Sequence, residues 1–179
     1  MKLNFRRLDL QLAHNWTIAR RAGTSVCRSV VVELTGADGT VGWGEAAPST
    51  RYKESVDTVQ AFFEQVDARG LSFNDVEGSM TYLDTLSPHD MSAKCALNLA
   101  LLDGAAKRAR KPICDFLELG FRENHHLTSF TIGIDTPDMI RQKVGSGELP
   151  GAEGESWRRR GQGHPAGITR SGADQDRAR

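Results

Sequence analysis

The sequence lacks the features that mark several specialised classes of protein. It has no apolar run long enough to span a bilayer. Its first residues, MKLNFRRLDLQLAH, alternate polar and apolar side chains and do not form the apolar centre of a signal peptide. Its 23 basic and 23 acidic residues cancel, so the composition favours neither nucleic acid nor an anionic membrane as a partner. We therefore expect a cytoplasmic protein with no nucleic-acid or membrane partner.

Residues typical of disulfide frameworks and metal sites are also scarce. The three cysteines, Cys27, Cys95 and Cys114, share no close spacing, which favours reduced thiols over a disulfide or a zinc site. His125 and His126 are adjacent and would point to opposite faces of a strand, so an exposed pair is favoured over a metal site. No catalytic residue and no metal ligand is predicted from these residues.

The last segment, from residue 145 to residue 179, lacks lysine and is rich in glycine and arginine. Its large apolar residues are Leu149, Trp157 and Ile168, too few to offset the entropy of ordering the chain, so we predict disorder. The run Arg158–Arg160 is then a solvated charge cluster, favoured over a nucleic-acid site. The change of composition is abrupt and falls within a helical pattern. We interpret it as a shift of reading frame, which comparison of the coding DNA in all three frames would test.

Strand patterns dominate the first 46 residues. Alternation predicts a strand from Leu3 to Leu12, and the polar, basic residues 14–24 predict a loop. Residues 26–34 and 40–46 are predicted to form a hairpin around a turn at residues 36–39. The sequence therefore predicts a three-stranded antiparallel meander.

Helical patterns follow the strands. We predict one helix from about Val56 that ends near Gly70, a second over residues 74–86, and a short one over residues 113–119. Strands followed by helices are typical of an α+β domain.

The longest helical pattern runs from Ser87 to Pro112. Ser87 suits the N-cap, Pro88 suits the first helical position, and basic residues precede the stop at Pro112. The pattern is apolar nearly all round, so we predict burial on more than one side. If one partner layer is absent, we predict an exposed apolar patch beside Leu99 and Leu102 or on the opposing face of the helix.

Two local features of this region have structural interpretations. Asn98 and Asp103 inside the apolar helix are predicted to be hydrogen-bonded structural groups. Residues 42–45, Gly-Trp-Gly-Glu, end a strand and open no helix, so they do not match a dinucleotide-binding fingerprint. They predict a close approach of backbones.

A second domain is predicted to begin after the helices. Residues 127–134 return to a strand pattern, and Thr136-Pro137-Asp138 predicts the start of a helix that covers residues 139–144. We therefore divide the chain into an α+β domain over residues 1–126, the start of a β/α domain over 127–144, and the disordered tail from 145.

Five stretches together resemble the enolase superfamily, in its muconate-lactonizing branch, and within it the L-Ala-D/L-Glu type of dipeptide epimerase. They occur in that family's order and at compatible spacing over roughly the first 144 residues. The stretches are HNWTIAR at 14–20, VGWGEAAP at 41–48, RY at 51–52, the segment from Ser92 to Gly104, and TSFTIGI at 128–134.

The resemblance implies an enolase-like N-terminal capping domain followed by a (β/α) barrel, of which this sequence contains only the first β/α unit. It also implies an isomerase, with a dipeptide or another small carboxylate as substrate, and an oligomer of identical chains. In the family, lysines on opposite faces of the substrate move the α-proton, and Mg²⁺ held by three acidic residues stabilises the enolate. The family's Lys-x-Lys belongs just beyond Val144, where this sequence has no lysine.

This sequence thus contains no catalytic residue and no metal ligand of the family. We expect an inactive N-terminal fragment of a Mg²⁺-dependent epimerase. A non-catalytic α+β interaction module, or a fragment similar to muconate cycloisomerase or o-succinylbenzoate synthase, is the alternative.

The resemblance also implies substrate-binding residues, because the family's loop between the first two capping strands closes over the active site. Here that loop is Trp16 to Thr24. A guanidinium offers a bidentate fork for a substrate carboxylate, while apolar side chains exclude water. A solvated basic loop anchored by one tryptophan is the alternative. The predicted substrate-binding residues are Trp16, Thr17, Ile18, Arg20 and Arg21 in the loop, and Thr131 on the first barrel strand.

Overall fold

The structure is a computed structural model that describes residues 1–18, 21–123, 125 and 133–145. Most of the predicted strand 127–134 and the tail from residue 146 lie outside these residues. The strands are β1 (Lys2–Ile18), β2 (Arg21–Thr35) and β3 (Val41–Ala46). The α-helices are α1 (Val56–Gln65), α2 (Val76–Leu86), α3 (Met91–Arg108), α4 (Ile113–Phe116) and α5 (Pro137–Gly145), and the 3₁₀ turns are η1 (Thr50–Tyr52) and η2 (Ala68–Gly70).

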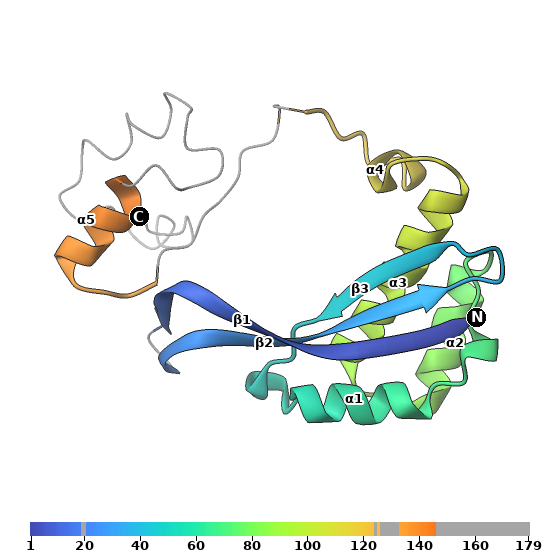
Figure 1. The fold of residues 1–179 in the computed structure, drawn as a ribbon, viewed down its shortest axis with the longest axis horizontal. Coiled ribbons are helices and arrows are strands. Elements are labelled where there is room, and N and C mark those ends of the chain that lie inside the picture. The colour runs from blue at the N-terminus through green and yellow to red at the C-terminus, as the bar shows by residue number, and fades with distance from the viewer. Residues whose placement is uncertain (19–20, 124, 126–132, 146–179) are drawn as a thin grey trace, which may run out of the picture. The chain divides into compact units, whose positions relative to one another are not determined.

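The three strands form one antiparallel sheet in the order β1-β2-β3, which confirms the predicted meander (Figure 1). β2 and β3 pair from Val30 opposite Ala46 to Thr35 opposite Val41. The turn between them closes with a hydrogen bond from the Gly39 N–H to the Gly36 carbonyl, and Gly39 has φ +80°, which favours glycine.

The predicted loop over residues 14–24 is wrong, because β1 continues to Ile18 and β2 already begins at Arg21. β1 and β2 are hydrogen-bonded neighbours, so each strand pairs with the backbone N–H and C=O groups of the other. A polar and exposed sequence can therefore remain extended. β3 pairs with β2 only from Val30 onward, so the rest of the hairpin is a ribbon of β1 and β2 alone.

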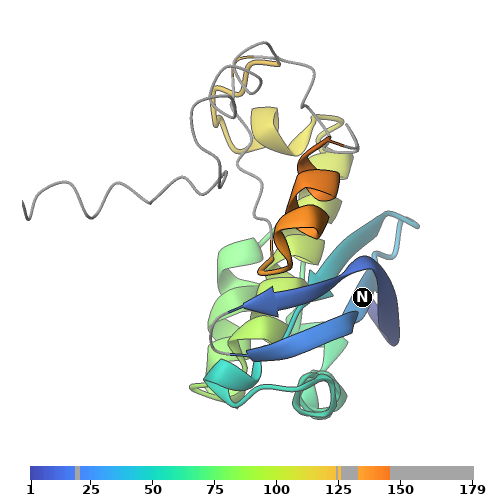
Figure 2. The same ribbon diagram turned by 90° about the vertical axis from the view of Figure 1, so that its left-hand side faces the viewer.

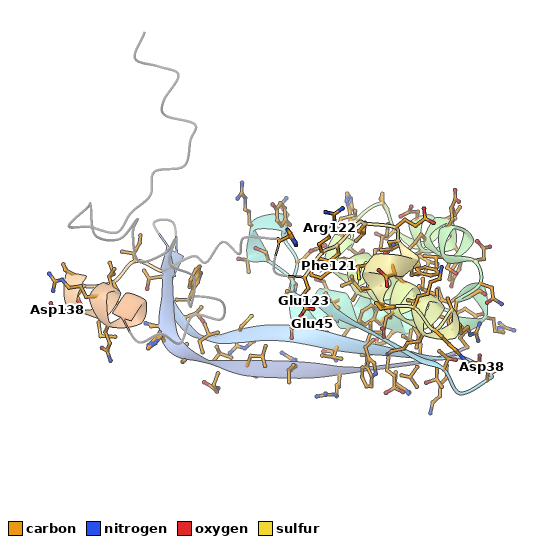
Figure 3. The ribbon with its side chains drawn as sticks, turned by 90° about the horizontal axis from the view of Figure 1, so that it is seen from above. Asp38, Glu45, Phe121, Arg122, Glu123 and Asp138 are labelled. Carbon is orange, nitrogen blue, oxygen red and sulfur yellow. The ribbon has the colours of Figure 1, made fainter. Side chains whose placement is uncertain are left out.

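Helices α1, α2 and α3 lie on one side of the sheet, as Figure 3 shows from above, and α2 and α3 stand beside each other (Figure 2). Ser55 and Thr58 form a reciprocal capping box that starts α1. The core lies between the helices and the sheet, and its largest fully buried apolar side chains are Val30, Val32, Leu34, Val59, Phe62, Phe63, Leu83, Leu97 and Leu101.

Helix α3 lies directly against β3, and the two backbones meet at glycines. A Cβ on Gly42 would overlap the Ala100 carbonyl oxygen, and a Cβ on Gly44 would overlap that of Ala96. The predicted close approach of backbones at residues 42–45 is therefore confirmed, and α3 is the partner.

Polar groups of α3 also engage the outer edge of β3. Asp103 Oδ2 accepts a hydrogen bond from the Trp43 N–H at 2.8 Å, which confirms its predicted structural role. Lys107 Nζ donates to the Val41 carbonyl at 3.0 Å and lies 2.6 Å from Asp103 Oδ2. Backbone groups that no strand pairs with are thus satisfied by side chains.

The start of α3 differs from the prediction. Ser87 was expected as its N-cap, but α2 ends there and α3 begins after Asp90, whose φ of 61° is left-handed and whose side chain does not cap the helix. Glu54 supplies the missing acceptor, since Ser92 donates both its N–H and its hydroxyl to the Glu54 carboxylate. A residue from the preceding loop therefore caps the helix.

A buried lysine joins α2 to α3. The Lys94 side chain is only 4% exposed, and its Nζ lies 2.7 Å from Asp84 Oδ1. The same Nζ donates to the Ser87 carbonyl at the end of α2 at 2.6 Å. The charge is thus paired and hydrogen-bonded, as burial requires.

A second cation joins the C-terminal end of α3 to the β2–β3 turn. Arg108 donates through Nη2 to Asp38 Oδ1 at 3.0 Å and through Nη1 to Asn74 Oδ1 at 3.1 Å. Its guanidinium also stacks 4.9 Å from the centre of the Phe73 ring. The hydrogen bond from Arg108 lowers the pKa of Asp38 from 3.8 to about 2. Figure 3 shows Asp38 at this turn and Glu45 towards the other end of β3.

The predicted burial of α3 on more than one side is correct only in part. Nine of its residues are buried, but Leu99 is 47% exposed. Met91, Cys95 and Leu99 follow at intervals of four residues and are all exposed, so they share one side of the helix. An exposed apolar face at Leu99 is therefore confirmed.

The described chain separates into two compact units. The first comprises residues 1–14 and 25–123, and the second comprises residues 15–24 together with the described residues after 124. In the second unit Thr136 Oγ1 accepts a hydrogen bond from the Met139 N–H, which confirms the predicted start of α5. Of the helices that the structure describes, none is both long and apolar enough to cross a membrane.

Candidate functional site

The described part of the candidate site is the end of the β1–β2 hairpin together with Gly133 and Ile134. Trp16 and Thr17 lie near the end of β1. The exposed fraction of Trp16 is 37%, and Thr17 is half-buried. Both residues therefore remain partly accessible at the position where the sequence predicted substrate contacts.

The polar side chains of this hairpin end gather over a glycine of β2. A Cβ on Gly23 would lie 2.6 Å from Asn15 Nδ2 and 2.7 Å from Thr17 Oγ1. Because side chains alternate along a strand, Asn15 and Thr17 share one face of the ribbon, and Trp16 projects from the other. The hairpin end thus has one polar face and one face with an indole ring.

A backbone hydrogen bond joins the hairpin to the last residue of the predicted barrel strand. The Ile134 N–H donates to the Thr17 carbonyl at 2.8 Å. Gly133 is buried, and a Cβ there would lie 3.2 Å from Thr17 O and 3.3 Å from Trp16 Cε3. The structure therefore brings Trp16 and Thr17 of the predicted loop into contact with Gly133 and Ile134.

The other predicted substrate-binding residues are not described as side chains. Ile18 ends β1 and Arg21 begins β2, but only their backbones are described. Arg20 and Thr131 lie outside the described residues. Their roles stay predictions.

Three residues of this region were missed as site residues by sequence reasoning. Asn15 and Gly133 stood inside the matching stretches but were not singled out, and Gly23 was taken as part of a loop. A glycine within a strand pattern is itself a signal of close backbone approach, and this signal applies to Gly133, which lies within the predicted strand 127–134.

A metal centre is not found in this part of the chain. Within the described ranges, no group of three or more His, Cys, Asp or Glu residues is placed to hold a metal ion. Mg²⁺ prefers several oxygen ligands in near-octahedral geometry, so the described residues do not fit a magnesium site.

Residues 10–118 match the N-terminal domain of the mandelate racemase / muconate lactonizing enzyme family. An L-Ala-D/L-amino acid epimerase from Pedosphaera parvula is 53% identical over 146 residues, which cover 80% of this chain and 42% of that protein. The chain therefore spans less than half the length of this curated relative.

Solved structures show the same relationship. The L-Ala-D/L-Glu epimerase from Bacillus subtilis, in a substrate-liganded complex, matches with a TM-score of 0.72 and 27% identity over 82% of this chain and 41% of that chain. A dipeptide epimerase from Enterococcus faecalis V583, complexed with Mg and the dipeptide L-Leu-L-Tyr, matches with a TM-score of 0.67 and 27% identity, covering 80% and 41%. The α+β fold and the place of the hairpin near the start of the sequence both agree with the match to this family's N-terminal domain. The chain belongs to the mandelate racemase / muconate lactonizing enzyme family of the enolase superfamily, of which it carries the N-terminal domain.

Proposed function

We propose that this chain is the N-terminal, substrate-capping part of a cytoplasmic, Mg²⁺-dependent dipeptide epimerase. The observation that carries the proposal is the 53% identity to an L-Ala-D/L-amino acid epimerase over 80% of the chain. The contact between the hairpin end and residues 133–134 supports it, because residues of a shared substrate pocket must lie near one another.

The capping part would contribute recognition and exclusion of water. Arg20 and Arg21 are positively charged residues at the hairpin end, and each offers a fork that fits a substrate carboxylate. Trp16, Thr17 and Ile18 would cover the substrate, and Thr131 would line the pocket from the first barrel strand. Excluding water strengthens every charge interaction within such a site.

Proton transfer would depend on other residues. Epimerisation needs one base on each side of the α-carbon, because the proton leaves one face and a proton returns to the other. Residues 1–179 contain no Lys-x-Lys pair. We therefore propose that this chain alone does not epimerise dipeptides, and that residues 1–126 form the cap, 127–144 the first barrel unit, and 145–179 a disordered segment from a shifted reading frame.

Mg²⁺ in the whole enzyme would stabilise negative charge on the enolate. The described residues do not form its site, so its ligands would come from barrel residues.

The test joins residues 1–144 to the barrel portion of the Pedosphaera parvula relative. Proton nuclear magnetic resonance then measures exchange of the α-proton of L-Ala-L-Glu in deuterated water with Mg²⁺. We expect no exchange with residues 1–179 alone and clear exchange with the chimera. Arg20→Ala in the chimera is expected to raise KM by at least about tenfold, because it removes a charge-assisted hydrogen bond.

Arg69→Ala is the matched control, since Arg69 is an exposed arginine on η2 that pairs with the neighbouring Asp67. Equal KM values for the two variants would contradict the role of Arg20. Exchange catalysed by the isolated chain would contradict the division of labour between cap and barrel.

A non-catalytic interaction module is the second candidate, favoured by the exposed apolar side of α3 at Met91, Cys95 and Leu99. Such a module would pair with a barrel supplied by another chain or with a second copy of itself. A folded chimera without activity, combined with a stable dimer of the chain, would support it.

A further inference from the structure

The hairpin end contacts Gly133 through main-chain atoms and one ring. A Cβ at residue 133 would lie 3.2 Å from Thr17 O, 3.3 Å from Thr17 N and 3.3 Å from Trp16 Cε3, closer than a side chain normally packs. Gly133 is buried, and the next residue donates its N–H to Thr17 O. A side chain at residue 133 would therefore have to displace these neighbours by a few tenths of an ångström, and a larger side chain by more.

The hairpin end also needs such a contact. Among the residues that the structure describes, β1 is the only strand that pairs with β2 from Arg21 to Ser29. A two-stranded ribbon is marginally stable in water without a surface to pack on. The surface that the structure provides for residues 16 and 17 is the Gly133–Ile134 backbone.

We propose that Gly133 and the Ile134 N–H form a seat that holds the end of the β1–β2 hairpin in position before any substrate binds. Gly133 is the positioning residue of this seat, and Trp16 is the side chain that packs on it. This proposal deepens the proposed function and rests on it, because the position of the hairpin end matters for substrate binding only if the chain caps a substrate site.

The seat assigns different roles to neighbouring residues. Thr17 O accepts a hydrogen bond from the Ile134 N–H, and Gly133 packs against the edge of the Trp16 ring. The side chains of Asn15 and Thr17 gather instead at Gly23, on the other face of the ribbon. Besides covering the substrate, Trp16 thus fixes the position of the hairpin, while Asn15 and Thr17 present the polar groups.

A hairpin held in place before binding has a direct physical benefit. Ordering a loop when a ligand binds reduces affinity, and a loop that is already ordered avoids that cost. The seat would therefore lower the free-energy cost of ordering the hairpin end when a substrate binds.

Amide hydrogen exchange of the full chain, followed by nuclear magnetic resonance without ligand, tests the seat. We expect the Ile134 amide of the wild type to exchange at least about tenfold more slowly than an unstructured amide. Gly133→Val should abolish this protection, and Gly133→Ala, with its smaller side chain, should reduce it. Ile134→Ala is the matched control, because it keeps the N–H and removes a side chain that is 57% exposed.

Amides of Leu97 and Leu101 in the buried part of α3 report whether the first unit stays folded. Loss of Ile134 protection with these amides unchanged supports the seat. An unprotected Ile134 amide in the wild type, or protection that survives Gly133→Val, overturns it. If Gly133→Val unfolds α3, the Gly133→Ala result decides.

The outcome is separable from that of the proposed function. A protected Ile134 amide together with an inactive chimera would contradict only the epimerase assignment. An active chimera with an unprotected Ile134 amide would contradict only the seat.

Discussion

At the residue scale, two glycines set the distance between β3 and α3. Gly42 and Gly44 face carbonyl oxygens of α3, at Ala100 and Ala96, with no room for a Cβ. The small alanines of the helix and the glycines of the strand together allow the backbones to meet. A methyl group would have to push the helix away from the sheet, and every buried side chain between them would lose contacts.

We predict that Gly44→Ala lowers the free energy of unfolding by at least about 3 kcal/mol, because overpacking against backbone atoms leaves no flexible neighbour to move. Gly39→Ala is the matched control. Gly39 has free space for a Cβ but a φ of +80°, so only conformational strain of about 1–2 kcal/mol applies. Urea unfolding followed by circular dichroism measures both, and an equal loss in the two variants would contradict the steric argument.

The sequence indicated some of these residue roles and not others. The Gly-Trp-Gly pattern predicted a close approach, and the position of Asp103 in an apolar helix predicted a hydrogen-bonded group. Neither pattern identified the partner, because Trp43 and Asp103 are 60 residues apart and are joined only by the fold. Gly133 stands within the predicted strand 127–134, a position that signals a close approach, but the pattern could not identify its neighbours on the hairpin, which are more than a hundred residues away in sequence.

At the scale of elements, the start of α3 shows how a distant residue overrides a local pattern. Ser87, Pro88 and Asp90 follow the usual order at a helix start. The helix begins later because Glu54 accepts from Ser92, and because Ser87 instead accepts the His89 N–H and donates to Asp90. Local propensity cannot detect a cap that comes from another loop.

We predict that Glu54→Ala destabilises the protein by about 1 kcal/mol, the usual cost of removing a helix cap. Glu54→Gln should cost less, because the amide keeps one acceptor for Ser92. Glu64→Ala, at an exposed position of α1, is the control for the loss of one carboxylate. Urea unfolding measures the three variants, and equal losses for Glu54→Ala and Glu64→Ala would refute the capping role.

The hairpin is the other element that the pattern misjudged. Residues 14–24 are polar and basic, which is typical of loops, and only the pairing of β1 with β2 explains their extended conformation. A ribbon exposed on both faces has no apolar alternation to reveal it. The family resemblance predicts substrate contacts at the same residues, and that assignment stays a prediction.

At the scale of the whole molecule, the order of strands and then helices was sufficient to predict the α+β class. The sheet order follows from the predicted meander, whereas the packing of α3 on β3 is known only from the structure. The apolar face of α3 was predicted as a surface that needs a further partner layer, and the structure leaves Leu99 47% exposed there. An exposed apolar face of this size is the kind of surface on which a further layer packs, which is what the second proposed function requires.

We predict that the chain increases the fluorescence of a hydrophobic dye such as anilinonaphthalene sulfonate, and that Leu99→Lys reduces this increase by about half or more. Ala61→Lys, at an exposed position of α1, is the control for added charge. Circular dichroism should show that both variants stay folded. No dye binding by the wild type, or equal binding by the two variants, would contradict an accessible apolar face at Leu99.

The engagement of β3 by Asp103 and Lys107 limits how the sheet can grow. Unpaired strand edges are templates on which further chains add, and a sheet with two open edges extends into a filament. Here the β3 edge is occupied by side chains of α3, while no described strand covers the outer edge of β1. A strand that added at β3 would have to displace the hydrogen bonds that Asp103 and Lys107 make to Trp43 and Val41. The contacts that pack α3 on the sheet therefore also protect this edge from strand addition.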